Sequence, residues 1–289
     1  MLSAVGFVLN TRKKQPVSLA KQLLQWFKER GIAVYAPEED SRMLGLNGHG
    51  NASHWGKLVQ CVIVIGGDGT FLRAARMIAP YGVPILGINM GTLGFLTEIE
   101  LSEVETALTR LLQGDFYIED RMMLEAKVTR GQQPVAAYIG LNDVVINKGP
   151  MARLITLDIF VDQEFVTTYT ADGVILASPT GSTAYSLSAG GPIVYPEIEV
   201  TLLTPICPHT LHARPLVIPA QKTTRVVVMN QQPDSMLTID GQSSFELFSG
   251  DEIFVSKAPF ITRLIRIKGQ SFFSILREKL KAEGRSFYE

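Results

Sequence analysis

The stretch that decides the fold is Val62-Ile-Val-Ile-Gly-Gly-Asp-Gly-Thr70, which is followed directly by Phe71-Leu-Arg-Ala-Ala-Arg76. From Cys61 to Ile65 every position is apolar, which is the pattern of a strand buried on both faces of a parallel sheet. After the glycines, the spacing predicts a helix over Phe71–Ile78. A glycine-rich turn between a buried strand and a helix offers backbone N–H groups to phosphates. The stretch therefore predicts an α/β unit with a phosphate-binding loop.

The remainder of the first 115 residues repeats the alternation of strand and helix. Further short strands are predicted at Ala4–Leu9, Ile32–Tyr35 and Val83–Ile88. One helix is predicted from a cap at Ser18 to Arg30, and another from a capping box at Ser102–Glu105 to Gly114. This order is typical of an open, mostly parallel α/β sheet.

Past residue 116 the pattern changes to strands separated by Gly, Pro, Asn and Asp turns. The predicted strands are Phe116–Arg130, Ala136–Val145, Leu154–Val161, Phe165–Ser178, Thr223–Met229, Met236–Ile239, Glu252–Ser256 and Thr262–Ile267. They indicate a mainly antiparallel β domain. A helix at Ser271–Lys281 is expected to return to the first domain. We therefore assign residues 1–115 and 270–289 to an α/β domain that carries the glycine loop, and 116–269 to a β-rich domain.

The composition excludes several classes of protein. The chain has 27 basic and 28 acidic residues and a formal net charge of −1, without the basic excess of a nucleic-acid-binding protein. The basic run Arg12-Lys13-Lys14 is interpreted as solvated surface. Two cysteines exclude a disulfide scaffold and fit a reducing compartment. No apolar stretch approaches the roughly 20 residues that span a bilayer, so we predict a soluble, cytoplasmic protein with no membrane partner.

Asp68 is the unusual residue of the glycine loop. A carboxylate in a phosphate cradle repels its ligand unless it accepts a proton from an attacking hydroxyl, orients that hydroxyl, or helps to hold a divalent cation. Arg73, one turn into the helix, could balance phosphate charge. The alternative is a tight turn in which Asp68 only caps the helix. The loop has neither the Gly-Lys-Ser/Thr of a Walker loop nor the Gly-x-Gly-x-x-Gly of redox dinucleotide folds, so a nucleotide-binding dehydrogenase is disfavoured. The loop by itself indicates phosphate binding beside an unusual carboxylate.

Two segments of the β-rich domain could bind a nucleotide. In Gly140-Leu-Asn142-Asp143, an adjacent amide and carboxylate could bind an adenine edge or ribose hydroxyls, although a lone pair of this kind is by default a capped turn. Ser178–Ser188 is dense in small and hydroxylated residues, and its Tyr185 could stack on a base. Gly190-Gly191-Pro192 suggests that this segment is ordered, which favours ligand binding over a flexible loop.

Two further patterns are interpreted as structural. His209 and His212 have a spacing outside the usual metal patterns, with no Cys or carboxylate close by. Asp240-Gly241-Gln242 is interpreted first as a hairpin turn.

Taken together and in this order, the motifs resemble those of the bacterial NAD kinases. The segments that carry the resemblance are the Gly66–Thr70 loop, Gly91-Thr-Leu-Gly-Phe95, Leu141–Asp143, Asp172-Gly173, Ser178–Tyr185, Pro208-His-Thr-Leu211 and Asp240–Gln242. Diacylglycerol and sphingosine kinases share the glycine loop, so Asn142-Asp143 and Thr180–Ser188 are the discriminating part. The resemblance implies an α/β domain, a β domain, and transfer of a phosphoryl group from ATP, with a divalent cation such as Mg²⁺, to the 2′-hydroxyl of the adenosine ribose of NAD.

The resemblance also assigns roles to individual residues. Asp68 takes the position of the general base, Gly69 approaches the dinucleotide, and Asn142 and Asp143 contact the bound nucleotide. The other positions that it places around the NAD site are Arg153, Thr170, Asp172, Thr183, Ala184, Tyr185, Ser186, Leu187, Ser188 and Gln242. Relatives form homodimers or homotetramers, and some use inorganic polyphosphate as donor, so the donor stays open.

Two rival functions are weighed against this one. Another kinase with the same loop could act on a lipid or sugar hydroxyl, but the polar segment 178–188 disfavours a lipid pocket. A non-catalytic NAD-binding sensor could use the same fold, but Asp68 in an intact loop disfavours it.

Overall fold

The computed structural model describes residues 2–46, 56–91, 94–149, 154–210, 212–229, 235–267, 269 and 271–285. The chain forms two compact units, of which the first comprises 1–120 with 262–289 and the second comprises 121–261. Residues 116–120 and 262–269, which the sequence analysis assigned to the β-rich domain, thus belong to the first unit.

The first unit is built on a parallel sheet, as predicted. Its strands, in spatial order, are β2 (Ala33–Tyr35), β1 (Ala4–Leu9), β3 (Cys61–Gly66), β4 (Ile85–Asn89) and the end of β16 (Glu252–Arg266). All six residues of β1 and all six of β3 are buried, because helices cover both faces of the sheet. The apolar runs that the sequence shows are therefore the centre of this sheet.

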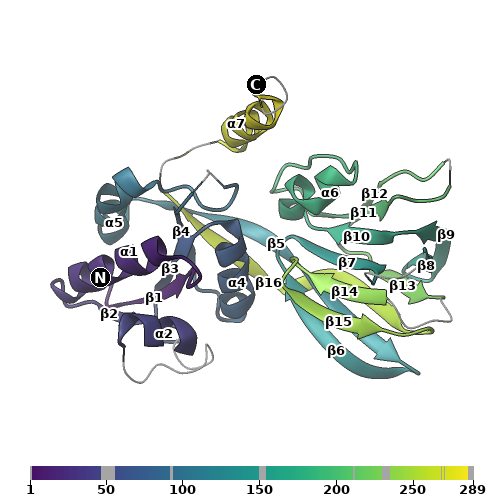
Figure 1. Cartoon of the computed structure of the whole chain (residues 1–289), viewed down its shortest axis with the longest axis horizontal. Helices are drawn as coiled ribbons and strands as arrows, with labels where there is room; N and C mark the ends of the chain where they lie inside the picture. Colours follow the sequence, from purple (N-terminus) through teal and green to yellow (C-terminus); the bar gives the residue numbers. More distant parts are fainter. Residues whose placement is uncertain are drawn as a thin grey trace. The chain divides into compact units, whose positions relative to one another are not determined.

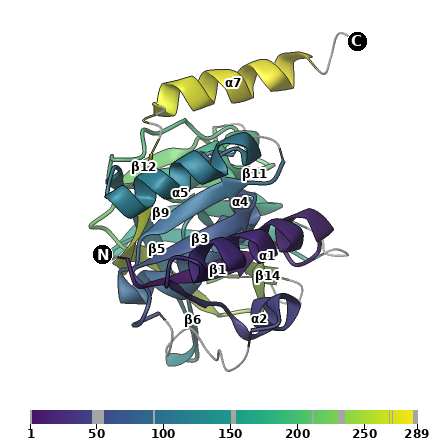
Figure 2. The same ribbon diagram turned by 90° about the vertical axis from the view of Figure 1, so that its left-hand side faces the viewer.

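Five described helices belong to this unit: α1 (Lys14–Lys28), α2 (Glu38–Leu44), α4 (Asp68–Ile78), α5 (Val104–Gln113) and α7 (Phe272–Arg285). α1 and α5 pack with the same side chains of β1, β3 and β4 in one buried cluster. Figure 2 shows these two helices in front of the sheet, with α4 behind it. α4 buries Phe71, Ala74 and Ile78. Two 3₁₀ turns lie at Ala79–Tyr81 and Leu101–Glu103.

The helix starts differ from the predicted ones. α1 begins at Lys14, not after Ser18, because Pro16 is tolerated within the first turn and starts the helix early. The capping box before α5 is formed by Glu100 and Glu103, not by Ser102 and Glu105. α4 begins at Asp68, so Gly67 is the capping position and Asp68 already lies in the first turn.

The second unit contains two layers of antiparallel strands. One sheet has the order β12 (Leu216–Pro219), β11 (Val200–Ile206), β10 (Gly173–Ala177), β7 (Asp143–Lys148), β14 (Ser235–Ile239), β15 (Ser243–Leu247). The other joins the start of β16 to β13 (Thr224–Val228), β8 (Ile155–Val161) and β9 (Glu164–Ala171), with β5 (Tyr117–Arg130) pairing β16 and β6 (Gln133–Gly140). Their facing side chains form one apolar core. The antiparallel prediction is confirmed (Figure 1).

Several strand boundaries in this unit were predicted wrongly. The expected strand Ala136–Val145 is two strands, β6 and β7, with a turn between them, and Phe165–Ser178 is likewise split into β9 and β10. β11, β12 and β15 were not predicted. The hairpin turn after β14 is confirmed: residues 240–242 connect β14 to β15, and the Gln242 N–H bonds to the Ile239 carbonyl at 2.9 Å. Asp240 and Gly241, at the centre of this turn, have left-handed φ values of 50° and 64°.

None of the helices in the described part of the chain combines the length and hydropathy needed to cross a membrane.

Candidate functional site

The glycine loop joins β3 to α4 in the first unit. β3 ends at Gly66, Gly67 is extended, and the Thr70 N–H closes the turn on the Gly67 carbonyl at 2.9 Å. A Cβ on Gly66 would lie 2.4 Å from Thr70 Oγ1, so the tight turn excludes a side chain there. Gly69 is exposed. The loop thus offers backbone and an open approach, as a phosphate-binding turn requires.

The carboxylate of Asp68 does not cap its own helix. It accepts hydrogen bonds from a second segment, residues 95–97: Phe95 N to Oδ2 at 2.9 Å, Leu96 N to Oδ1 at 3.2 Å, and Thr97 N and Oγ1 to Oδ1, both at 3.3 Å. Among the described residues, Oδ1 therefore has three donors and Oδ2 has one. Because these donors stabilise a negative oxygen, they hold Asp68 as an oriented carboxylate. Oδ2 is the oxygen with the capacity for another partner.

Gly94 makes this arrangement sterically feasible. A Cβ on Gly94 would lie 2.0 Å from Asp68 Oδ1, whereas a Cβ on Gly91 would meet no atom of the described residues within 4 Å. Of the two glycines in the predicted motif Gly91–Phe95, Gly94 is therefore the one that the carboxylate requires. Thr92 and Leu93 lie outside the described residues.

A buried charge network supports the same segment from behind. Arg266 pairs with Glu119 at 2.7 Å and with Glu98 at 3.5 Å, and its Nη2 donates to the Phe95 carbonyl at 3.5 Å. Glu98 also accepts the Ile267 N–H at 2.6 Å. The sequence analysis did not predict this network. It connects the end of β16 to the segment 95–97, whose N–H groups bond to Asp68.

Arg73, which was predicted to balance phosphate charge, forms contacts within the first unit. Its Nη2 donates to the Leu9 carbonyl at 2.6 Å and pairs with Asp40 at 3.0 Å. Asp40 is fully buried and also accepts the Leu9 N–H at 2.9 Å. Burial raises the pKa of Asp40, and the charge of Arg73 offsets part of that effect. Arg73 therefore ties α4 and α2 to the end of β1.

In the second unit a cavity of about 360 Å³ lies beside the start of β7. It is lined by Asn142, Asp143, Val145, Asn147, Ala184, Tyr185, Thr238, Asp240 and Gly241. The amide oxygens of Asn142 and Asn147 are buried and have no hydrogen-bond partner within the described residues. A buried polar atom left unpaired costs about 1–3 kcal/mol. Two unpaired acceptors at one cavity therefore leave hydrogen-bonding capacity for a ligand or a water molecule.

Asp240 shapes the turn that carries Asn142 and Asp143. Its carboxylate accepts the backbone N–H groups of Leu141, Asn142 and Asp143 at 3.1, 2.8 and 3.2 Å. Burial, and then the negative charge of Asp240, raise the pKa of Asp143 to about 7. The cavity therefore holds two close carboxyl groups, of which one retains its proton up to near-neutral pH.

Asp143→Asn is expected to stabilise the protein while weakening nucleotide binding. Between pH of about 4 and 7 the unfolded chain loses the Asp143 proton and the folded chain keeps it, so the free energy of unfolding falls as pH rises through this range. Asparagine removes this penalty. Denaturant unfolding at pH 5 and pH 8 should show a larger gain for the variant at pH 8. A gain independent of pH would contradict the titration of Asp143.

The segment after β10 packs on the same turn. It forms a 3₁₀ turn over Thr180–Thr183 and a short helix α6 (Tyr185–Ser188) that packs on β10 (Figure 1). A Cβ on Gly181 would lie 2.1 Å from the Asn142 carbonyl oxygen, so the backbones touch there. The Ser186 hydroxyl is buried and bonded to Thr204 at 2.9 Å, whereas Tyr185 is 44% exposed at the cavity. Ser186 thus supports the segment and Tyr185 presents a ring.

The structure brings together only part of the predicted site. Of the residues assigned to nucleotide binding, Asn142, Asp143, Ala184 and Tyr185 line the cavity. The others in the second unit are placed outside that lining: Thr170, Asp172, Thr183, Ser186, Leu187, Ser188 and Gln242. Arg153 lies outside the described residues. Val145, Asn147, Thr238, Asp240 and Gly241 line the cavity without having been assigned to the site.

Two contacts show what the outlying positions do. Asp172 pairs with Lys148 at 2.6 Å, and the Thr170 carbonyl accepts the His209 N–H at 2.9 Å.

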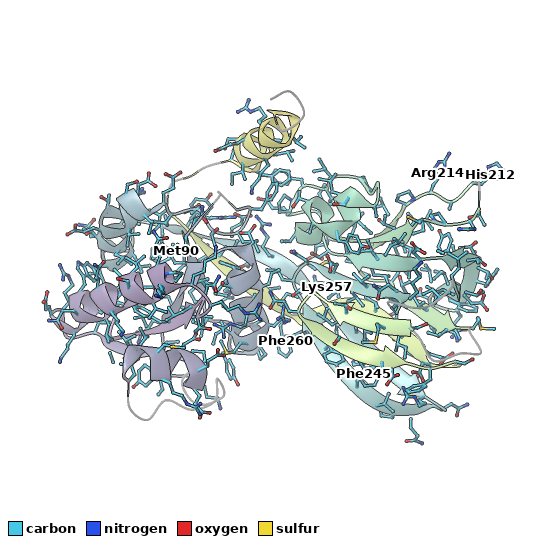
Figure 3. All side chains as sticks on the ribbon, in the orientation of Figure 1. Met90, His212, Arg214, Phe245, Lys257 and Phe260 are labelled. Atoms are coloured by element: carbon cyan, nitrogen blue, oxygen red, sulfur yellow. The ribbon has the colours of Figure 1, made fainter. Side chains whose placement is uncertain are left out.

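Figure 3 shows His212 and Arg214 at the end of the loop from β11 to β12. No cluster of three or more His, Cys, Asp or Glu residues occurs in the described part of the chain.

A parallel α/β unit with an oriented carboxylate in a Gly-Gly-Asp-Gly-Thr loop, together with an antiparallel β unit, defines a kinase of the class that carries this loop. Residues 5–116 match the family model of the ATP-NAD kinase N-terminal domain, and residues 141–267 match that of the C-terminal domain. The chain belongs to the ATP-NAD kinase family.

Individual relatives agree with this assignment. The chain is 45% identical to the NAD kinase of Moorella thermoacetica over 98% of its own length and 91% of that protein, and 51% identical to that of Carboxydothermus hydrogenoformans over 78% and 81%. Among solved structures, yeast NADH kinase complexed with NADH has a TM-score of 0.87 at 27% identity, covering 97% of this chain and 88% of that one. An Archaeoglobus fulgidus NAD kinase in complex with ATP has a TM-score of 0.74 at 25% identity, covering 96% and 98%.

Proposed function

We propose that this protein transfers the γ-phosphoryl group of ATP to the 2′-hydroxyl of the adenosine ribose of NAD. The observation that carries the proposal is the Asp68 carboxylate, which three backbone N–H groups and the Thr97 hydroxyl orient inside a glycine loop. Membership of the ATP-NAD kinase family supports the choice of donor and acceptor. The rival lipid, sugar and sensor functions gain no support from that membership.

In this proposal Asp68 is the general base. Its Oδ1 is occupied by three donors, so Oδ2 accepts the proton of the attacking hydroxyl. The exposed backbone around Gly69 would lie against phosphate oxygens. Positioning and electrostatic stabilisation supply most of the catalysis in a phosphoryl transfer, and the hydrogen-bonded segment 94–97 keeps the base in a single orientation.

A divalent cation is compatible with this site even though the described residues provide no cluster of three or more metal-binding side chains. Mg²⁺ in kinases is held through one or two carboxylates and the phosphates of the substrate, and it keeps several waters. Because Oδ2 takes the proton of the hydroxyl in this proposal, Asp68 would hold the cation through one of its bound waters. When bound, the cation would neutralise charge on the transferred phosphoryl group.

The cavity of the second unit would bind the nucleotide. The unpaired amide oxygens of Asn142 and Asn147 can accept from an adenine amino group or a ribose hydroxyl, and Asp143 can bind ribose hydroxyls. The Tyr185 ring can stack on the base. Arg153, Thr170, Asp172, Thr183, Ser186–Ser188 and Gln242 remain proposed contacts on the basis of the resemblance alone.

We also propose a cytoplasmic homodimer or homotetramer, in which Arg153, Thr170 and Asp172 contribute to the NAD site of a neighbouring subunit. Light scattering after gel filtration measures the oligomer directly, and a monomer that retains full activity would contradict it.

The experiment that tests the function is an assay of NADP formation. The purified protein is incubated with NAD and MgATP, and in parallel with NAD and polyphosphate, while diacylglycerol with MgATP serves as the control acceptor. NADP formation with at least one donor is expected, with no product from the lipid. NAD binding without NADP formation from any donor would instead identify a sensor.

A further inference from the structure

A second cavity lies at the loop after β1, the strand at which the order of strands in the first unit reverses. β2, the next strand in the chain, pairs with one edge of β1, and β3 pairs with the opposite edge of β1. In open α/β sheets, ligands bind outside the carboxyl ends of the strands at such a switch point. Here the two carboxyl ends lead into the loop before α1 and the glycine loop before α4. The Asn10 N–H still bonds to the Ile65 carbonyl at 3.0 Å, so the two loops start side by side.

The loop after β1 lines a cavity of about 480 Å³ that is rich in cations. Its lining consists of Thr11, Arg12, Lys13, Lys14, Val17, Ser18, Lys21 and Met43. None of the four basic side chains forms an ion pair within the described ranges of the chain. Four like charges around one hollow repel each other, and an anion in the hollow relieves that repulsion.

The acidic residues near this cavity are engaged by other partners. Asp40 is paired with Arg73, and Glu38 with Arg42. Glu39 accepts a hydrogen bond from the Thr11 hydroxyl at 3.1 Å, so one carboxylate does lie at the rim. The first turn of α1 contains no acidic residue. The described carboxylates therefore leave the four cations with a net positive field.

The cationic loop is held in place by buried contacts. Asp40 and Arg73 fix the N–H and the carbonyl of Leu9, the last residue of β1. Asn10 then folds the chain back, because its Oδ1 accepts the Arg12 N–H at 3.2 Å and its carbonyl accepts the Lys13 N–H at 3.4 Å. A loop organised in this way can present its charges to a ligand without a large ordering cost.

We propose that this cavity binds the phosphate chain of the phosphoryl donor, a nucleoside triphosphate. The inference rests on the proposed function and adds a donor subsite formed by Arg12, Lys13, Lys14 and Lys21. Four cations match a triphosphate better than the two phosphates of a dinucleotide. The adjacency of the loop to Gly66 and Gly67 places it beside the turn at which the phosphoryl group is transferred.

The test compares two double variants that remove the same charge. Lys13→Gln with Lys14→Gln removes two cations from the cavity, whereas Lys28→Gln with Lys57→Gln removes two exposed lysines of the same unit that do not line it. The cavity variant should raise the KM for ATP at least tenfold and leave the KM for NAD within twofold. The control variant should change neither constant by more than twofold. A KM for ATP within twofold of the parent, or equal rises in both KM values, would overturn the donor subsite.

Binding of inorganic tripolyphosphate, measured by calorimetry, separates the subsite from the catalytic proposal. The parent protein should bind it, and the cavity variant should bind it at least tenfold more weakly, whether or not NADP is formed. Equal binding by the parent and the cavity variant would overturn the subsite even in an active enzyme. If the parent forms no NADP but binds tripolyphosphate, and the cavity variant does not bind it, the anion site stands and the proposed function is rejected.

Discussion

Asp68→Asn is expected to lower kcat by about 10²–10⁴-fold, the contribution of a general base. The amide cannot take up the proton of the acceptor hydroxyl. It also has one oxygen where the carboxylate has two, so its NH₂ group must face either the Phe95 N–H or the three donors at Oδ1. We therefore expect the segment 94–97 to loosen as well. NADP formation under saturating substrates measures the loss.

NAD binding provides the control for this variant. The cavity lined by Asn142 and Tyr185 belongs to the other unit, so the Kd for NAD should change much less than kcat. Hydrogen exchange at residues 95–97 reports the loosening separately. Turnover close to that of the parent protein would refute Asp68 as the base.

Gly94→Ala is expected to reduce kcat at least 100-fold with Asp68 intact. The added methyl would lie 2.0 Å from Asp68 Oδ1, which forces the carboxylate or the segment 94–97 to move. A misplacement of about 1 Å in a reacting group can cost about 10²-fold in rate. The same NADP assay applies.

Gly91→Ala is the matched control for Gly94→Ala, because its added Cβ meets no described residue within 4 Å and its φ is not positive. It should retain activity within about threefold, as expected for an unstrained surface change. Equal losses in the two variants would mean that glycine flexibility, and not the fit against Asp68, matters in this segment.

The sequence was sufficient to predict the features that depend on neighbouring residues. The apolar run Cys61–Ile65 with its glycine turn predicted a buried parallel strand and a phosphate loop, and both the sheet and the turn are present. The pair Asp240-Gly241 predicted a hairpin from its turn chemistry alone. β11 escaped prediction because it contains Pro205, a residue that argues against a strand, and because its residues do not alternate in polarity.

The features that were not predicted join residues far apart in the chain. No local pattern indicates that Asp240 binds the backbone of Leu141–Asp143, or that Arg73 is paired with Asp40. Asp40 stands in an acidic run, Glu38-Glu39-Asp40, that resembles ordinary helix surface, yet it is fully buried. The family resemblance did not predict the ion pair between Arg73 and Asp40, which is visible only in the folded structure.

β16 has a consequence for how the protein is made. Leu264 pairs with Ile85, so the sheet of the first unit is completed by a strand that the ribosome synthesises after the entire second unit. Arg266, which supports the Phe95 segment, emerges at the same late stage. During synthesis, residues 1–120 therefore have an unpaired sheet edge until residues 262–289 are made. Residues 121–261, the whole second unit, are synthesised before that edge is paired. A nascent chain stalled before residue 262 would thus carry the glycine loop and residues 95–97, but would lack Arg266 and Ile267, which bond to Phe95 and Glu98.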